Sequence, residues 1–125
     1  YLPYVMAALY AKKNQLNDCI VLNSFGRACD SAIANVFIIK KDTIITPPLS
    51  EGCVAGVMRR WMLEKFDLKG FKVIEKNLSV NDILNASEFF LTNSVHHLRW
   101  VKHFREKNYA NKITKEIYNF ILQTI

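Results

Sequence analysis

The residues between Asp30 and Arg60 carry the clearest chemical pattern in this sequence. Asp30 is an acid in a segment with few other polar groups, and Gly56 stands at the expected start of a helix. A buried carboxylate needs a cationic partner or several hydrogen-bond donors, and free amides at a helix start bind anions. This stretch therefore suits a ligand with a basic nitrogen at one end and a phosphate at the other.

Both features also have an ordinary structural explanation. The partner of Asp30 can be an internal arginine rather than a ligand, and a glycine before a helix most often only makes a tight turn. If an anion does bind, the first-turn amides of Val57 and Met58 point at it. The hydroxyls of Thr92 and Ser94 follow an apolar strand, where they can face a ligand or simply form a turn.

Histidine and cysteine do not form a metal-binding pattern. His96 and His97 are adjacent, so on a strand they face opposite sides, which is a poor arrangement for a shared metal. The three cysteines are an odd number at unrelated spacings, namely Cys19, Cys29 and Cys53. This usage argues against a disulfide framework or zinc site and favours a reducing, cytoplasmic compartment. We expect no metal.

The composition fits one globular domain. The chain has 125 residues, of which 50% are hydrophobic, and it lacks the apolar run of about 18 residues that a membrane span requires. The formal net charge is +6, but the lysines are scattered. The densest basic run, 99–107, is interleaved with aromatic residues, and a solvated surface is favoured over a nucleic-acid interface. We expect neither nucleic acid nor membrane as a partner.

Hydrophobic periodicity predicts a mixture of helices and strands without regular alternation, so the class is α/β or α+β with one core. A hairpin is expected around Lys41-Asp42, and Ser79 with Asp82 resembles a helix N-cap. The predicted helices cover 3–15, 56–66, 80–86 and the segment from about Tyr109 onward. The predicted strands cover 19–23, 28–30, 35–41, 43–46, 71–76, 89–92 and 98–101. The inward positions predicted for the second helix are Val57, Trp61, Met62 and Phe66.

Four segments, in this order and spacing, resemble the class IV aminotransferase family, the pyridoxal-phosphate enzymes of fold type IV. They are 23–40, Thr-Pro-Pro-Leu at 46–49, Gly-Val-Met-Arg at 56–59 and Glu-Phe-Phe-Leu-Thr-Asn-Ser at 88–94. The resemblance covers nearly the whole chain, as the C-terminal half of the family. It implies that 1–125 form the C-terminal cofactor-binding domain, a mixed sheet or pseudo-barrel with flanking helices, and that the N-terminal domain is absent from this chain.

The resemblance also implies roles for individual residues toward pyridoxal 5′-phosphate. Asp30 takes the place of a glutamate that faces the pyridine nitrogen, although aspartate has a shorter reach. The amides of Val57 and Met58 and the hydroxyl of Ser94 are implied to hold the phosphate. The other implied cofactor contacts are Tyr1 near the phenolic oxygen, and Ile33 and Ala34 along the cofactor face.

The largest departure from the family concerns its catalytic lysine. The Schiff-base lysine is expected just before the position of Tyr1, and none of the lysines present occupies that place. No catalytic residue is therefore expected in this chain. Alone it should be inactive, while its full-length parent should be the enzyme.

Two positions favour the lyase branch of the family, because Met58 and Asn93 resemble residues of that branch. The implied reaction is that of 4-amino-4-deoxychorismate lyase, which releases pyruvate and forms 4-aminobenzoate for folate synthesis. The alternative is a branched-chain or D-amino-acid aminotransferase, and the non-enzyme alternative is a basic binding or interaction domain. Family membership implies a homodimer that acts on a small amino substrate.

Arg99, with His97 beside it, is a candidate for binding a carboxylate of the substrate, because both follow Ser94 closely. In the full-length enzyme, Arg99→Ala should then weaken substrate affinity roughly tenfold or more through the loss of a charge-assisted hydrogen bond. Steady-state kinetics measure this, and an unchanged affinity would remove Arg99 from the site.

Overall fold

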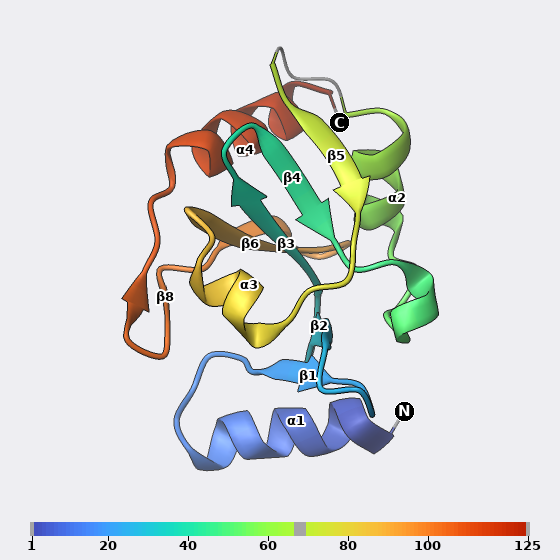
Figure 1. The fold of residues 1–125 in the computed structure, drawn as a ribbon, viewed down its shortest axis with the longest axis vertical. Coiled ribbons are helices and arrows are strands. Elements are labelled where there is room, and N and C mark those ends of the chain that lie inside the picture. The colour runs from blue at the N-terminus through green and yellow to red at the C-terminus, as the bar shows by residue number, and fades with distance from the viewer. Residues whose placement is uncertain (1, 67–69, 125) are drawn as a thin grey trace.

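The computed structural model describes residues 2–66 and 70–124, which form a mixed sheet with helices on both faces (Figure 1). The strands of the sheet are β1 (Ile20–Leu22), β2 (Ala28–Ser31), β3 (Asn35–Lys40), β4 (Thr43–Thr46), β5 (Lys72–Glu75), β6 (Glu88–Asn93) and β7 (His97–Trp100). The helices are α1 (Leu2–Lys13), α2 (Val57–Glu64), α3 (Val80–Leu84) and α4 (Lys112–Thr124), with a 3-10 turn η1 (Leu49–Glu51). A separate small hairpin consists of β8 (His103–Phe104) and β9 (Lys107–Asn108).

Strand β3 organises the sheet. It pairs antiparallel with β6 from Asn35 to Ile39, so its other edge is shared by β2, which pairs at Asn35, and β4, which pairs from Ile38 onward. β4 and β5 run parallel, whereas the other pairs in the sheet are antiparallel. The predicted mixed α and β class with a mixed sheet is confirmed.

The core lies on both faces of β3, because alternate side chains of a strand point to opposite sides. Val36 and Ile38 join an apolar cluster that includes Ile83 of α3. Phe37 and Ile39 join a second cluster on the other face, which Met58 and Met62 of α2 and Ile117 and Ile121 of α4 complete. Burial on both faces explains why β3 is a continuous apolar run rather than an alternating one.

Two local sequence patterns form as predicted. The β3–β4 hairpin turns at Lys41 and Asp42, and Lys41 adopts a φ of 58°, which this tight two-residue connection requires. The amide of Asp82 donates to Ser79 Oγ at 3.0 Å, and the amide of Ser79 donates to Asp82 Oδ2 at 2.9 Å. This reciprocal capping box fixes the start of α3.

The last helix begins at Lys112, so the prediction of a start near Tyr109 was wrong by three residues. Tyr109 is held by other contacts: its amide donates to the carbonyl of Lys102 at 2.9 Å, and its hydroxyl donates to the carbonyl of Ile83 at 2.7 Å. The β8–β9 hairpin, which the sequence did not predict, lies within the interval between Lys102 and Tyr109.

Glu88 sets the observed start of α4 from a distance. Its carboxylate lies in β6, is buried, and accepts hydrogen bonds from the amides of Ile113 and Thr114 at 2.9 and 2.8 Å. The hydroxyl of Thr114 donates to the same carboxylate at 2.7 Å. An anion at this position satisfies first-turn amides and is favoured by the helix dipole.

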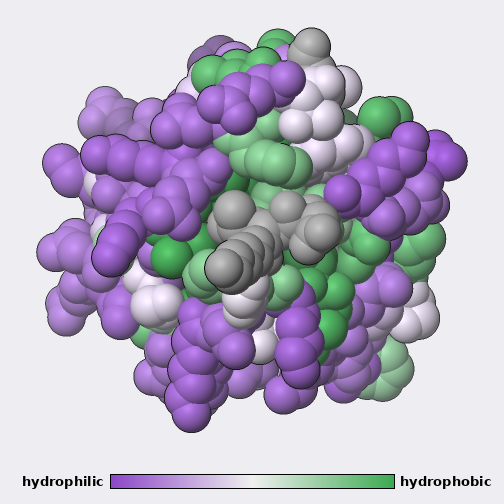
Figure 2. Space-filling model, turned by 90° about the horizontal axis from the view of Figure 1, so that it is seen from above, coloured by the Kyte–Doolittle hydropathy of each residue, from purple (hydrophilic) through white to green (hydrophobic). Residues whose placement is uncertain are grey.

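Seen from above, hydrophilic residues cover much of the outer part of this face, and hydrophobic residues lie near its centre and at parts of its edge (Figure 2). At the opposite end, α1 lies alongside β1 (Figure 1), and its exposed apolar residues include Val5, Met6, Leu9 and Tyr10. Within residues 2–66 and 70–124, no helix has the length and apolar character needed to cross a membrane.

Candidate functional site

A cavity of about 390 Å³ opens between β2, β3 and β6 and the first turn of α2. The side chains that line it belong to elements far apart in the sequence, which the sheet brings together. Five of the residues expected to contact a cofactor line this cavity, namely Asp30, Ile33, Ala34, Val57 and Ser94. Met58 is not in this lining, because its side chain is buried in the core. Tyr1 lies outside the described residues.

Asp30 is the buried acid of this cavity, with 2% of its surface exposed. Its Oδ2 atom accepts hydrogen bonds from the hydroxyl of Tyr4 at 2.7 Å and the amide of Val54 at 2.8 Å. Its Oδ1 atom accepts one from Asn35 Nδ2 at 2.9 Å. Burial raises the pKa of Asp30, and these hydrogen bonds together with the charge of Arg59 offset part of that rise.

The two explanations left open for Asp30 can now be compared. Among the described residues, no arginine or lysine forms an ion pair with it. The guanidinium of Arg59 instead donates to the carbonyl of Pro47 and to the carboxylate of Glu75. Three neutral donors therefore hold the carboxylate, and it lines the cavity without a directly bound cation.

Asn35 connects this acid to the start of α2, a role that no pattern in the sequence indicated. Besides Asp30, its Nδ2 atom donates to the carbonyl of Val54 at 2.8 Å. A Cβ atom at Gly56 would lie 2.2 Å from Asn35 Oδ1. Gly56 has an ordinary φ of −68°, so glycine is required here for space, and the space it leaves is occupied by the carboxamide that orients Asp30.

The start of α2 faces the same cavity. Gly56 is its N-cap residue and supplies no side-chain cap, so the first-turn amides have no partner within the helix. Across the cavity, Thr92 is 1% exposed, and in the described part of the chain its hydroxyl has no hydrogen-bond partner. A buried hydroxyl without a partner, in the same cavity as free helix amides, suits an anionic ligand.

Val57 corrects one expectation about α2. It was predicted to face the core, but 65% of its surface is exposed and it lines the cavity. Met62 faces the core as predicted, and Met58 faces the core in place of Val57. Val57 is the first residue of α2, and the positions that face the core begin at the next residue, Met58.

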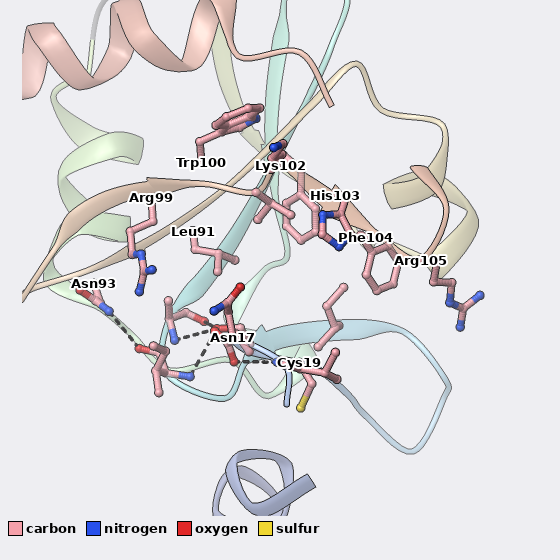
Figure 3. A pocket seen from close by; sticks show the side chains of 18 of the residues that line it. Asn17, Cys19, Leu91, Asn93, Arg99, Trp100, Lys102, His103, Phe104 and Arg105 are labelled. Atoms are coloured by element: carbon pink, nitrogen blue, oxygen red, sulfur yellow. Dashed lines mark hydrogen bonds between the residues drawn. The ribbon is translucent and has the colours of Figure 1, made fainter. Parts of the chain in front are cut away.

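A second cavity of about 780 Å³ adjoins the first (Figure 3). Its lining is largely apolar, and its charged residues are Arg99, Lys102, Arg105 and Asp18. Arg99 extends into it from β7 (Figure 3). Four residues line both cavities, namely Ser31, Ile33, Ala34 and Asn93. Arg99 is therefore placed beside the Asp30 cavity rather than within its lining.

His97 is not in the lining found for either cavity, whereas its neighbour His96 lines the larger one. His97 is the first residue of β7, pairs with Asn93 and has a φ of 61°. Asn93 Oδ1 accepts hydrogen bonds from the amides of Val95 and His96, which stabilises the turn between the two strands. His97 is therefore part of the β6–β7 hairpin.

Comparison with known proteins identifies sequence relatives. Residues 1–104 match the family model described as amino-transferase class IV. The chain is 32% identical over 91 residues to aminodeoxychorismate lyase of Vibrio harveyi, which covers 73% of this chain and 34% of that protein. It is 35% identical over 94 residues to branched-chain-amino-acid aminotransferase 6 of Arabidopsis thaliana, which covers 74% and 26% respectively. The chain spans about a third or less of the length of these relatives.

The fold is also similar to solved structures. One is the crystal structure of an aminotransferase from Brucella abortus bound to the cofactor PLP, with a TM-score of 0.87 and 21% sequence identity. The match covers 96% of this chain and 43% of that chain. At this identity, the match establishes a shared fold.

Proposed function

The chain belongs to the amino-transferase class IV family, and from that premise we propose that it is the C-terminal, cofactor-binding domain of a pyridoxal 5′-phosphate enzyme. One observation carries the proposal: a buried carboxylate that has no ion-pair partner among the described residues and an uncapped helix start face the same cavity. The cofactor has a basic ring nitrogen and a phosphate, which are the groups that these two features bind.

The Asp30 side of the cavity suits the ring nitrogen. Asp30 Oδ2 accepts hydrogen bonds from two donors, whereas Oδ1 accepts one, from Asn35, among the described residues. Since each carboxylate oxygen offers two lone pairs, Oδ1 can accept one further hydrogen bond from a protonated nitrogen. When bound, the cofactor supplies an electron-withdrawing ring that stabilises negative charge on a substrate carbon.

The α2 side suits the phosphate. The amides of Val57 and Met58 belong to the uncapped first turn, and the hydroxyls of Thr92 and Ser94 come from the end of β6 and the turn after it. Asn93 Nδ2 donates to the carbonyl of Ile33, which ties this turn to the segment on the other wall of the cavity.

Thr92→Val tests the phosphate side, because valine keeps the shape of threonine and removes only the hydroxyl. In the ligand-free chain this change should be neutral or stabilising, since it removes a buried hydroxyl without a partner. It should weaken pyridoxamine 5′-phosphate binding about tenfold, the value of one charge-assisted hydrogen bond. Calorimetric titration measures the affinity, and pyridoxamine without phosphate is the control that should bind equally to both forms. An equal affinity of both forms for the phosphorylated ligand would remove Thr92 from the site.

For the reaction, we propose 4-amino-4-deoxychorismate lyase activity of the full-length enzyme, with Arg99 binding a substrate carboxylate. The Vibrio harveyi relative supports this branch, and Arg99, Lys102 and Arg105 in the cavity beside the Asp30 cavity support an anionic amino substrate. The alternative, a branched-chain aminotransferase, is supported by the Arabidopsis thaliana relative.

The two reactions differ in their products. The lyase proposal predicts that the full-length enzyme converts aminodeoxychorismate to 4-aminobenzoate and pyruvate, which chromatography detects. Amino transfer from a branched-chain amino acid to 2-oxoglutarate, without release of 4-aminobenzoate, would overturn the lyase proposal in favour of the alternative.

Two further parts of the proposal concern the rest of the enzyme. Among the residues that the structure describes, no lysine lines the Asp30 cavity, so this domain is proposed to seat the cofactor while a lysine outside the chain reacts with it. The exposed apolar residues of α1 are consistent with a covered surface in a homodimer. Sedimentation of the full-length enzyme as a monomer would contradict the dimer.

A further inference from the structure

We propose that Tyr4 is a positioning residue that keeps a proton on the ring nitrogen of the bound cofactor, acting through Asp30. This inference rests on the proposed function. It concerns a hydroxyl that reaches the acid from a different element, because Tyr4 belongs to α1 and Asp30 to β2.

The geometry makes Tyr4 a donor to the carboxylate. Its hydroxyl lies 2.7 Å from Asp30 Oδ2 and 3.2 Å from the carbonyl oxygen of Gly52. A phenol has one proton, and the shorter distance is to the acid. With the amide of Val54 on the same oxygen at 2.8 Å, two donors converge on Oδ2. The opposite oxygen, Oδ1, has Asn35 as its donor, and the Asp30 side chain lines the cavity.

The protonation state of Tyr4 makes it the donor of this hydrogen bond. Burial and the hydrogen bond to Asp30 raise the pKa of Tyr4, so the phenol stays protonated and remains a donor at every working pH. Donors to a carboxylate stabilise its charged form and lower its basicity. Burial has the opposite effect on Asp30, because it raises the pKa of that carboxyl.

The consequence concerns a proton shared between Asp30 and the ring nitrogen. Such a proton moves toward whichever partner is more basic, and the two groups titrate as a pair. By lowering the basicity of Asp30, Tyr4 leaves the proton on the nitrogen, where the electron-withdrawing ring requires it. Loss of the phenol hydroxyl should therefore move this proton toward Asp30.

A purely structural role is the competing explanation, because the same hydrogen bond ties α1 to the sheet. The protonation state of the ring nitrogen separates the two roles. A structural tie changes how much ligand binds, whereas a positioning residue changes the nitrogen signal of the ligand that is bound.

The experiment uses pyridoxamine 5′-phosphate labelled with nitrogen-15 in the ring, because this ligand has no aldehyde and needs no lysine. Bound to the unmodified chain, it should give the chemical shift of a protonated ring. In Tyr4→Phe, the signal should move toward that of a neutral pyridine. Tyr118→Phe is the control, since it removes the hydroxyl of an exposed tyrosine in α4 that lines neither cavity. It should leave the signal unchanged.

A second ligand separates the effect on the nitrogen from damage to the fold. In this analogue, carbon replaces the ring nitrogen, so it makes no hydrogen bond to Asp30. Tyr4→Phe should bind pyridoxamine 5′-phosphate roughly three- to tenfold more weakly and the analogue as tightly as the unmodified chain does. Equal losses for both ligands, or an unchanged nitrogen signal in Tyr4→Phe, would overturn the role of Tyr4 alone. Absence of binding to the unmodified chain would overturn the proposed function as well.

Discussion

Asp30→Asn should weaken the binding of pyridoxamine 5′-phosphate about a hundredfold, the largest functional effect expected from a single substitution in this chain. Removing one member of a buried charged pair costs several kcal/mol, because the remaining charge is left without its partner. Asp30 is almost fully buried and no other acid lines its cavity, so no described side chain can replace it. Calorimetric titration measures the loss.

Two controls separate this effect from general damage. Asp42→Asn changes an exposed acid in the β3–β4 turn and should leave affinity unchanged. The analogue without a ring nitrogen should bind Asp30→Asn and the unmodified chain equally. If Asp30→Asn retained full affinity for pyridoxamine 5′-phosphate, Asp30 would not contact the ring nitrogen.

Glu88→Ala should have the largest effect on stability, a loss of about 3–5 kcal/mol in the free energy of unfolding. The substitution removes the acceptor of three hydrogen bonds. It leaves the amides of Ile113 and Thr114, at the start of α4, without the carboxylate that accepts from them. The residues Ile117 and Ile121, which α4 contributes to the core, depend on this helix start. Urea unfolding followed by circular dichroism measures the change.

Glu88→Gln is the matched variant, because its amide keeps one acceptor oxygen and should lose less stability than Glu88→Ala. Glu116→Ala removes an exposed acid from α4 itself and should change stability by less than about 0.5 kcal/mol. A loss for Glu88→Ala no greater than that for Glu116→Ala would show that the carboxylate does not hold the helix.

The parts of the fold that the sequence predicted are those that local chemistry specifies. The turn at Lys41-Asp42 and the capping box of Ser79 and Asp82 depend on residues no more than three apart. The apolar run of β3 identified the central strand, because both of its faces are buried. Neighbours along the chain determine such features, so a single sequence reveals them.

The parts that the sequence missed depend on contacts between distant residues. The start of α4 is set by Glu88, 25 residues before Ile113, and Tyr109 is held by Ile83, 26 residues away. Helical periodicity alone predicts that α4 begins near Tyr109. These contacts hold the segment before Lys112 in another conformation.

The candidate site divides in the same way. Asp30 and Val57 were identified from their segments, and the structure brings both to one cavity. Tyr4 and Asn35 gave no local signal, because their roles arise from side-chain contacts with Asp30 that only the folded sheet creates. For Gly56, the sequence indicated a glycine at a helix start, but the atom that requires it belongs to Asn35.

A crystal structure of the chain with pyridoxamine 5′-phosphate tests the central claim most directly, because that claim assigns the two ends of the ligand to two sides of one cavity. We expect the ring nitrogen within hydrogen-bond distance of Asp30 Oδ1 and the phosphate at the amides of Val57 and Met58, with Thr92 Oγ1 as a further donor. A ligand in the reverse orientation, or one bound only in the larger cavity that Arg99 lines, would contradict the account.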